Sequence, residues 1–231
     1  MLVDCNNAKN TWNYEDVGID VEDATNYGCD GGWMHWAYDF VGKYGIMAEE
    51  DYPYTAVEGS CYYDSTEVEV GLKKWKWISS DTAYMRKDGL QKAPLSIAMA
   101  FGGKLSYYSS GVVPHDDDSW CSQWLNHAIT IVGYEPGEEK VTEERTTQRC
   151  RARRKKDADG CRRPDEYVLD GSCCRDIETT VETSTDAVWK IQNSWGSGWG
   201  DEGYFYGAVG EGSGLCGMNT HVFLPVPDLL D

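Results

Sequence analysis

Nine cysteines spread over 231 residues constrain the fold of this chain more than any other feature of its sequence. They are Cys5, Cys29, Cys61, Cys121, Cys150, Cys161, Cys173, Cys174 and Cys216. No two of them have the Cys-x-x-Cys spacing of a zinc site or a thioredoxin-like redox motif. Scattered cysteines of this kind are typical of structural disulfides formed in an oxidising compartment. Because their number is odd, at least one has no partner within the chain.

Charge and hydropathy exclude two classes of protein. The chain has 21 Lys and Arg residues against 39 Asp and Glu residues, which gives a net charge of −18. Such a charge repels phosphate groups, so we expect no nucleic-acid partner. The mean hydropathy is −0.57, and no apolar run approaches the roughly 18 residues that a membrane-spanning helix needs. The composition therefore predicts a folded domain with no membrane span.

The first third of the chain contains helical patterns. Apolar residues at helical spacing between positions 31 and 44 predict a helix with one apolar face. These residues are Trp33, Trp36, Ala37, Phe40, Val41 and Tyr44. Asp30 is the expected N-cap and Gly45 the expected C-terminal stop. A second, short helix is predicted over residues 82–92, ended by Pro94.

From Leu95 onward the pattern changes to short strands rich in β-branched and aromatic residues. They begin at Leu95, His127, Val188, Tyr204 and His221. A helical part followed by an antiparallel part predicts an α+β protein with two lobes. We place the helical lobe at residues 1–85 and the mainly β lobe at residues 86–231.

Residues 135–187 fit neither lobe. The segment holds few large apolar residues, four of the cysteines and a basic cluster at residues 149–163. We interpret it as a partly disordered insertion between two strands. Its four cysteines, Cys150, Cys161, Cys173 and Cys174, are enough for two disulfides, and the sequence does not determine how they pair. The basic cluster is consistent with a protease cleavage site or a polyanion-binding patch, but a solvated loop is the interpretation we favour.

His127 and Asn193 lie in strings whose surroundings carry more information than either residue alone. The strings NHAITIVGY and WKIQNSWGSGWGDEGYF resemble the histidine and asparagine blocks of papain-like (cathepsin-type) cysteine peptidases. Further blocks of that family follow in the same order. They are LVDC at residues 2–5, YGCDGGWM at 27–34, GIMAEEDYPY at 45–54, SC at 60–61 and GLCGM at 214–218. Ordered agreement of this kind is far more specific than any single motif.

The resemblance implies a papain-like two-lobe fold whose second lobe is an antiparallel, barrel-like sheet. It also implies a mechanism in which a cysteine thiolate attacks the peptide carbonyl. By the same resemblance, His127 is the general base and acid, and Asn193 orients its imidazole. Trp195 would pack over the hydrogen bond between them and shield it from water. No metal and no cofactor is implied.

Substrate contacts and two disulfides also follow from the resemblance. Gly31 and Gly32 match the residues whose backbone pairs with an extended substrate. Five further residues match the pocket that selects one substrate side chain, and we expect His221 at its floor to tolerate acidic or polar side chains when protonated. These residues are Trp33, Met34, Leu125, Asn126 and His221. The implied disulfides join Cys5 to Cys61 and Cys121 to Cys216.

The chain departs from the family at one decisive place. The nucleophilic cysteine of the family lies in a C-G-S-C-W block upstream of LVDC, with an oxyanion-hole glutamine before it, and neither is present in this sequence. We therefore expect residues 1–231 to be a partial peptidase domain with a truncated helical lobe, inactive by itself. In the family, Cys29 pairs with a cysteine next to the nucleophile, so Cys29 is the expected odd cysteine.

Three interpretations remain open. We favour a fragment of an active peptidase, which explains the absent nucleophile, the absent signal peptide and the odd cysteine together. The alternatives are a catalytically dead pseudopeptidase that binds peptides or inhibitors, and a chain completed by another polypeptide. Expected partners are peptide substrates, inhibitors, and the missing N-terminal segment or propeptide. The expected location is lysosomal, vacuolar or secreted.

Overall fold

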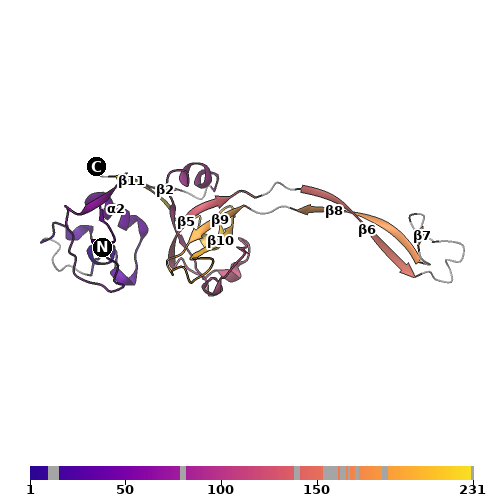
Figure 1. Cartoon of the computed structure of the whole chain (residues 1–231), viewed down its shortest axis with the longest axis horizontal. Coiled ribbons are helices and arrows are strands. Elements are labelled where there is room, and N and C mark those ends of the chain that lie inside the picture. The colour runs from indigo at the N-terminus through magenta and orange to yellow at the C-terminus, as the bar shows by residue number, and fades with distance from the viewer. Residues whose placement is uncertain are drawn as a thin grey trace. The chain divides into compact units, whose positions relative to one another are not determined.

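The computed structural model describes the chain as two compact units (Figure 1). The described residues are 1–9, 16–78, 82–137, 141–152, 161, 165, 167–169, 172–183 and 187–229. The first unit contains residues 1–135 and 188–231, and the second contains Pro136–Ala187. The second unit therefore begins and ends within one residue of the insertion that the sequence predicts.

Helices are few and short in the first unit. The α-helices are α1 (Leu2–Cys5), α2 (Met34–Tyr44) and α3 (Thr82–Tyr84), and a π-helical turn, η3, spans Met85–Gly89. Short 3-10 turns are η1 (Val21–Asp23), η2 (Gly28–Asp30), η4 (Leu105–Tyr107), η5 (Asp118–Trp120) and η7 (Leu215–Gly217). None of the helices in the described ranges has the length and apolar character to cross a membrane.

Helix α2 confirms the helix predicted over residues 31–44, but its predicted N-cap is wrong. The helix begins at Met34 and ends against Gly45, whose φ is +74°. Asp30 instead ends the turn η2, because Gly31 and Gly32 follow it with φ values of +96° and +156°. The side chain of Asn26 accepts a hydrogen bond from the Trp33 N–H at 2.8 Å, so a residue outside the helix supplies the polar partner at its start.

The predicted helix over residues 82–92 is only partly confirmed. Helix α3 contains three residues and passes into the π-helical turn η3. In that turn the Leu90 N–H bonds to the Met85 carbonyl, five residues back, at 2.9 Å. The regular α-helix is therefore shorter than the sequence pattern indicates.

The first unit is built on one eight-stranded sheet with the order β1-β2-β11-β3-β5-β9-β10-β4. Its strands are β1 (Ile46–Met47), β2 (Val68–Ile78), β3 (Leu95–Met99), β4 (Val112–Val113), β5 (His127–Glu135), β9 (Val188–Gln192), β10 (Tyr204–Ala208) and β11 (Val222–Leu229). Every neighbouring pair is antiparallel except β10 and β4. This open, mostly antiparallel sheet with few helices is the predicted α+β fold with a reduced helical lobe.

Strand β2 is a long element that the sequence pattern did not reveal. It pairs with β11 from Ile78↔Val222 to Val70↔Leu229, with a register shift at Val226/Pro227. Helix α2 packs against it, and the Trp75 indole N–H donates to the Asp39 carboxylate at 2.7 Å. The β2–β11 ladder therefore connects α2 to the central strands of the sheet.

Two separate hydrophobic clusters form the interior of the first unit. The smaller lies in the N-terminal part and contains Cys5, Ile19, Ala24, Phe40, Met47, Tyr52 and Cys61. The larger includes the buried faces of β3, β5, β9 and β10, with Trp189 and Phe205 fully buried in it. Separate cores in the N-terminal and C-terminal parts are what a two-lobe arrangement requires.

Asp4 and Cys5 give the LVDC block its structural role. The Asp4 carboxylate is buried and accepts hydrogen bonds from the Gly59 N–H at 2.6 Å and from the Tyr52 hydroxyl at 3.0 Å. Burial is the main cause that raises the pKa of Tyr52, and the nearby Asp4 charge adds to it. Cys5 is bonded to Cys61, so this one turn of chain is tied to residues 52–61 by a disulfide and two hydrogen bonds.

The second unit is a three-stranded sheet with the order β6-β8-β7 (Figure 1). Strands β6 (Val141–Ala152) and β8 (Ser172–Thr183) pair over twelve residues each, and β7 (Tyr167–Leu169) pairs with the beginning of β8. Cys161 is bonded to Cys173, and Cys174 is also in a disulfide. Most of the basic cluster, residues 153–160 and 162–163, lies outside the described residues.

Removing the Cys121–Cys216 disulfide should destabilise the first unit strongly. The bond closes a loop of 95 residues, and on the chain-entropy model such a loop contributes about 4 to 5 kcal/mol. Loss of a native disulfide typically lowers the free energy of unfolding by about 2–5 kcal/mol. We expect a decrease of about this size for a Cys121→Ser/Cys216→Ser variant, measured by guanidinium titration. Cys29→Ser, which removes an exposed free thiol, is the matched control and should leave stability unchanged.

Candidate active site

The antiparallel ladder between β5 and β9 brings His127 and Asn193 together although 66 positions separate them. His127 is the first residue of β5, where it pairs with Met99 of β3. Asn193 directly follows β9, whose last residue, Gln192, pairs with Thr130. The two side chains therefore lie at the same end of neighbouring strands.

Hydrogen bonding at Asn193 fixes the orientation of both side chains. His127 Nε2 lies 2.8 Å from Asn193 Oδ1. The same oxygen accepts the Ser194 backbone N–H at 2.8 Å, which identifies it as the oxygen and not the amide nitrogen. His127 Nε2 must therefore carry the proton that it shares with Asn193. In the neutral imidazole the other nitrogen, Nδ1, then holds the lone pair that can accept a proton.

Two aromatic rings contact His127, and a third packs against them. Phe101 meets the His127 ring edge-to-face with 4.9 Å between centroids, and Trp195 lies 5.6 Å from it in a tilted arrangement. Phe101 also contacts Trp195 at 5.1 Å, and Trp199 contacts Trp195 at 5.4 Å. Trp195 is 45% exposed, so its indole faces solvent, whereas the Asn193 side chain next to His127 is buried, with 7% exposed.

Glycines in the segment after Asn193 permit a tight turn that returns the chain to β10. The Asn193 N–H donates to the Gly203 carbonyl at 3.0 Å, and the Gly203 N–H donates to the Trp199 carbonyl at 2.8 Å. Gly200 has φ +61°, and a Cβ there would lie 2.4 Å from the Tyr204 carbonyl oxygen. A side chain at this position would therefore displace the turn that holds Asn193.

A cavity of about 910 Å³ opens beside His127. Seven residues that the sequence predicts for the site line it: Gly31, Gly32, Trp33, Met34, Leu125, Asn126 and His127. Tyr27, Trp36 and Ser194 also line it, although the sequence analysis did not single them out. Tyr27 lies in the YGCDGGWM block and Trp36 is one helical turn from Trp33, so the positions of both in the sequence could have predicted that they line the cavity.

Two predicted substrate-binding residues have other contacts. The Asn126 side chain lines the cavity but also pairs with the Phe101 backbone, accepting its N–H at 2.8 Å and donating to its carbonyl at 3.2 Å. His221 lines a neighbouring cavity, and its ring contacts Trp33 and Trp77 in tilted arrangements, with 5.2 Å between centroids in each case. The structure thus places His221 beside the first cavity and not in its lining.

Cys29 also lines the cavity beside His127. It is the free cysteine among the residues that the structure describes, and it is exposed. Its backbone N–H donates to Glu58 at 2.7 Å. The described side chains include no group of three or more His, Cys, Asp or Glu residues arranged to hold a metal ion.

Comparison with known proteins assigns the class. The model of the papain family of cysteine proteases matches residues 1–161 and 171–226. The match covers most of the chain and includes His127, Asn193 and both glycines of the cavity. The chain belongs to the papain family of cysteine proteases, as the resemblance of its motifs predicts.

Relatives and solved structures agree with this assignment. Fruit bromelain of Ananas comosus is 27% identical over 87% of this chain, and vignain of Vigna mungo is 27% identical over 92% of it. These alignments cover 44% and 47% of the relatives, so the chain spans about half their length. The structure of Ananas comosus bromelain with the E64 inhibitor has a TM-score of 0.58 at 25% identity, covering 87% of this chain and 72% of bromelain. A procathepsin L 3 of Tenebrio molitor gives 0.60 at 25% identity, covering 97% of this chain and 53% of that one.

The tautomer of His127 offers a direct test of this geometry. We expect long-range ¹H–¹⁵N correlation spectra to show the neutral imidazole of His127 protonated on Nε2. Asn193→Ala should convert it to a mixture of tautomers, because the acceptor that selects Nε2–H is removed. Asn193→Asp, which keeps an oxygen acceptor, should retain the Nε2–H form. A wild-type imidazole protonated mainly on Nδ1 would contradict the arrangement described above.

Proposed function

We propose that this chain supplies the histidine–asparagine half of a cysteine peptidase site together with a peptide-binding cavity. In this proposal His127 exchanges the proton of a cysteine thiol through Nδ1, and Asn193 orients the imidazole. The observation that carries the proposal is the bond from Nε2 to Asn193, which leaves Nδ1 free to act beside the cavity.

Peptide binding is the second part of the proposal. Gly31 lies in the lining of the cavity with no atom within 4 Å of the position that a Cβ would occupy. An extended peptide can therefore approach the Gly31 backbone closely, which favours strand-like pairing. Trp33 and Leu125 supply apolar surface on the same cavity, which favours an aliphatic or aromatic substrate side chain.

In this proposal, the chain does not contain the nucleophilic cysteine. Six cysteines are held in three disulfides, Cys174 is in another, and Cys150 lies opposite Cys174 in the second unit. Cys29 belongs to the YGCDGGWM block, which is structural in the family. We therefore propose that the thiolate and its oxyanion-stabilising glutamine come from outside residues 1–231, as in a fragment of a larger peptidase. A lysosomal, vacuolar or secreted location fits the disulfides.

Substitution of Gly31 should test the peptide-binding cavity. We expect Gly31→Ala to weaken binding of a fluorescein-labelled, leucine-containing hexapeptide at least about fivefold, measured by anisotropy. Gly111→Ala is the matched control, because Gly111 also has a positive φ and open space above it but lies outside the cavity lining. Both variants carry a backbone strain of about 1–3 kcal/mol, so equal weakening in the two would contradict a direct role for Gly31.

The recombinant chain should bind peptides without cleaving them. We expect no release of product from a peptide-coumarin substrate at pH 5 or pH 7, because no thiolate is paired with His127. Turnover that a thiol-alkylating inhibitor abolishes and that Cys29→Ser removes would show that Cys29 is the nucleophile. Failure of every peptide to bind would contradict the proposal as well as the alternative of a peptide-binding pseudopeptidase.

A further inference from the structure

The second unit separates its charged residues onto two faces of one ribbon of strands. The ladder between β6 and β8 runs without interruption from Val141↔Thr183 to Ala152↔Ser172 (Figure 1). Alternate residues of a strand lie on the same face of a sheet, and directly paired residues share a face. The register therefore assigns every residue of these two strands to one face or the other.

One face of this ribbon is basic and the other is acidic. The basic face is the one that contains Arg145, Arg149 and Arg151 of β6 and Arg175 of β8. Glu143 is the acidic residue that the same register places on it. The opposite face contains four acidic residues of the ladder and no Lys or Arg: Glu144, Asp176, Glu178 and Glu182. Solubility alone requires no such sorting, because both signs interspersed serve it equally well, so the sorting indicates a partner that bears negative charge.

The arginines gather at one end of the basic face. Arg149 and Arg175 are direct partners in the ladder, and Arg151 is the next residue of β6 on the same face. Like charges directly opposite each other on neighbouring strands destabilise the pairing, and a bound anion offsets that cost. The Asp165 carboxylate lies 3.6 Å from the Arg175 guanidinium, and both groups are partly exposed, so this ion pair is weak. One carboxylate beside three arginines leaves a positive site.

Disulfides restrain the same end of the ribbon. Cys173, which is paired with Arg151, is bonded to Cys161. Cys174, which lies opposite Cys150, is also held in a disulfide. The strand segments that contain the arginines are therefore restrained before any ligand binds, which lowers the entropy cost of binding.

We propose that the basic face of the second unit binds a sulfated polysaccharide. Arginine donates paired hydrogen bonds to oxyanions and stays charged at physiological pH, so it matches sulfate groups. The strand extends about 20 Å from Arg145 to Arg151, so the ligand that fits is a linear chain with repeated negative groups and not a single ion. Structural disulfides form in oxidising compartments. Sulfated polysaccharides, and not nucleic acids, are the abundant linear polyanions outside the cytosol.

The charge of the whole chain does not prevent this binding. The net charge is −18, but interactions between exposed charges are largely screened beyond about 8 Å at physiological salt. An anion on the basic face therefore interacts chiefly with the four arginines there. The proposal involves the second unit alone, so it does not depend on the peptide-binding function.

Binding of fluorescein-labelled heparin oligosaccharides to the full chain, measured by anisotropy, tests this proposal. We expect the wild-type chain to bind heparin at low salt and to release it as salt is added. Arg149→Gln/Arg175→Gln should weaken binding at least about tenfold, because it removes the two paired charges of the site. Glu143→Gln should tighten binding about two- to threefold, because it removes the acidic residue of the same face.

Lys73→Gln/Lys74→Gln is the matched control, because it removes two positive charges from exposed residues of the first unit. It should bind heparin as the wild-type chain does. Equal weakening by the two double variants would overturn the proposal, since net charge alone would then explain binding. Tighter binding by Glu143→Gln cannot result from unfolding, so its absence would also count against the basic face.

Two further probes test the choice of ligand. Desulfated heparin of the same length should bind at least about tenfold more weakly than heparin, because arginine loses its sulfate partners. A single-stranded DNA oligonucleotide of equal charge that binds more tightly than heparin would overturn the assignment to a sulfated polysaccharide. Absence of heparin binding by the wild-type chain at low salt would overturn the proposal outright.

Discussion

The antiparallel hydrogen-bond ladder between β5 and β9 is the constraint on which the rest of the site depends. It places His127 and Asn193 at the same end of neighbouring strands, and its other end pairs Glu135 with Val188. The second unit, the fifty-two residues Pro136–Ala187, is inserted between the two residues of this last pair. The insertion therefore does not separate the two strands. Long insertions whose ends already lie side by side cost little in loop closure. The placement of His127 beside Asn193 is therefore compatible with an insertion of this length.

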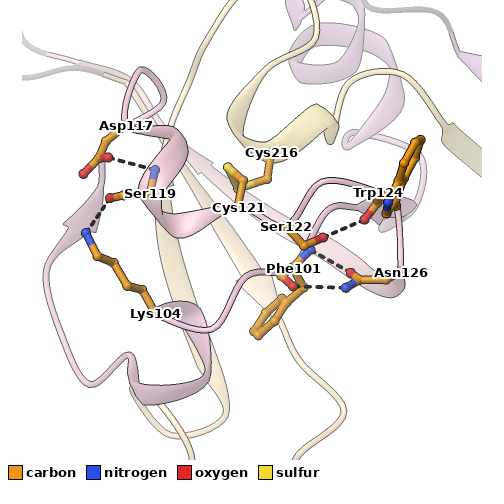
Figure 2. Close-up of a disulfide and its surroundings, with 9 residues drawn as sticks. All are labelled: Phe101, Lys104, Asp117, Ser119, Cys121, Ser122, Trp124, Asn126 and Cys216. Carbon is orange, nitrogen blue, oxygen red and sulfur yellow. Dashed lines mark hydrogen bonds between the residues drawn. A yellow bond between two sulfur atoms is a disulfide. The ribbon is translucent and has the colours of Figure 1, made fainter.

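Orientation of the imidazole is achieved within this chain alone. Asn193 Oδ1 is itself fixed by the Ser194 N–H, and Phe101 packs edge-to-face against the His127 ring. The Phe101 backbone is in turn held by the Asn126 side chain, as Figure 2 shows. Each restraint comes from residues of β3, β5, β9 or the segments that follow them. A cysteine would thus meet a histidine whose tautomer and ring plane are already set.

Much of the fold could be predicted because its elements follow simple periodicities. The strands beginning at Leu95, His127 and Val188 alternate or run as short apolar segments, and α2 has a clear apolar face. Strand β2 was missed because Lys73, Lys74 and Lys76 interrupt its apolar pattern on both sides of Trp75, and its pairing with β11 shifts register where Lys73 lies. The N-cap was misplaced because Asn26, eight positions before Met34, provides the polar contact, which no local pattern can indicate.

The site also contains contacts that the sequence predicts and contacts that it does not. The contact between His127 and Asn193 could be predicted because their motifs are specific, whereas the contact of Phe101 with His127, 26 positions away, could not. His221 was expected in the cavity beside His127, but it contacts Trp33 and Trp77 and lines a neighbouring cavity. Contacts between segments distant in sequence decided each of these outcomes.

In the proposed function, the His127–Asn193 pair has no thiolate partner in this chain. The most direct test is the intact mass of the protein after exposure to one equivalent of an epoxysuccinyl peptide that alkylates thiolates activated by histidine. We expect no adduct within a time that labels an active papain-family enzyme completely. A stoichiometric adduct on Cys29 that His127→Ala abolishes would contradict the account, because it would show that the chain carries its own nucleophile.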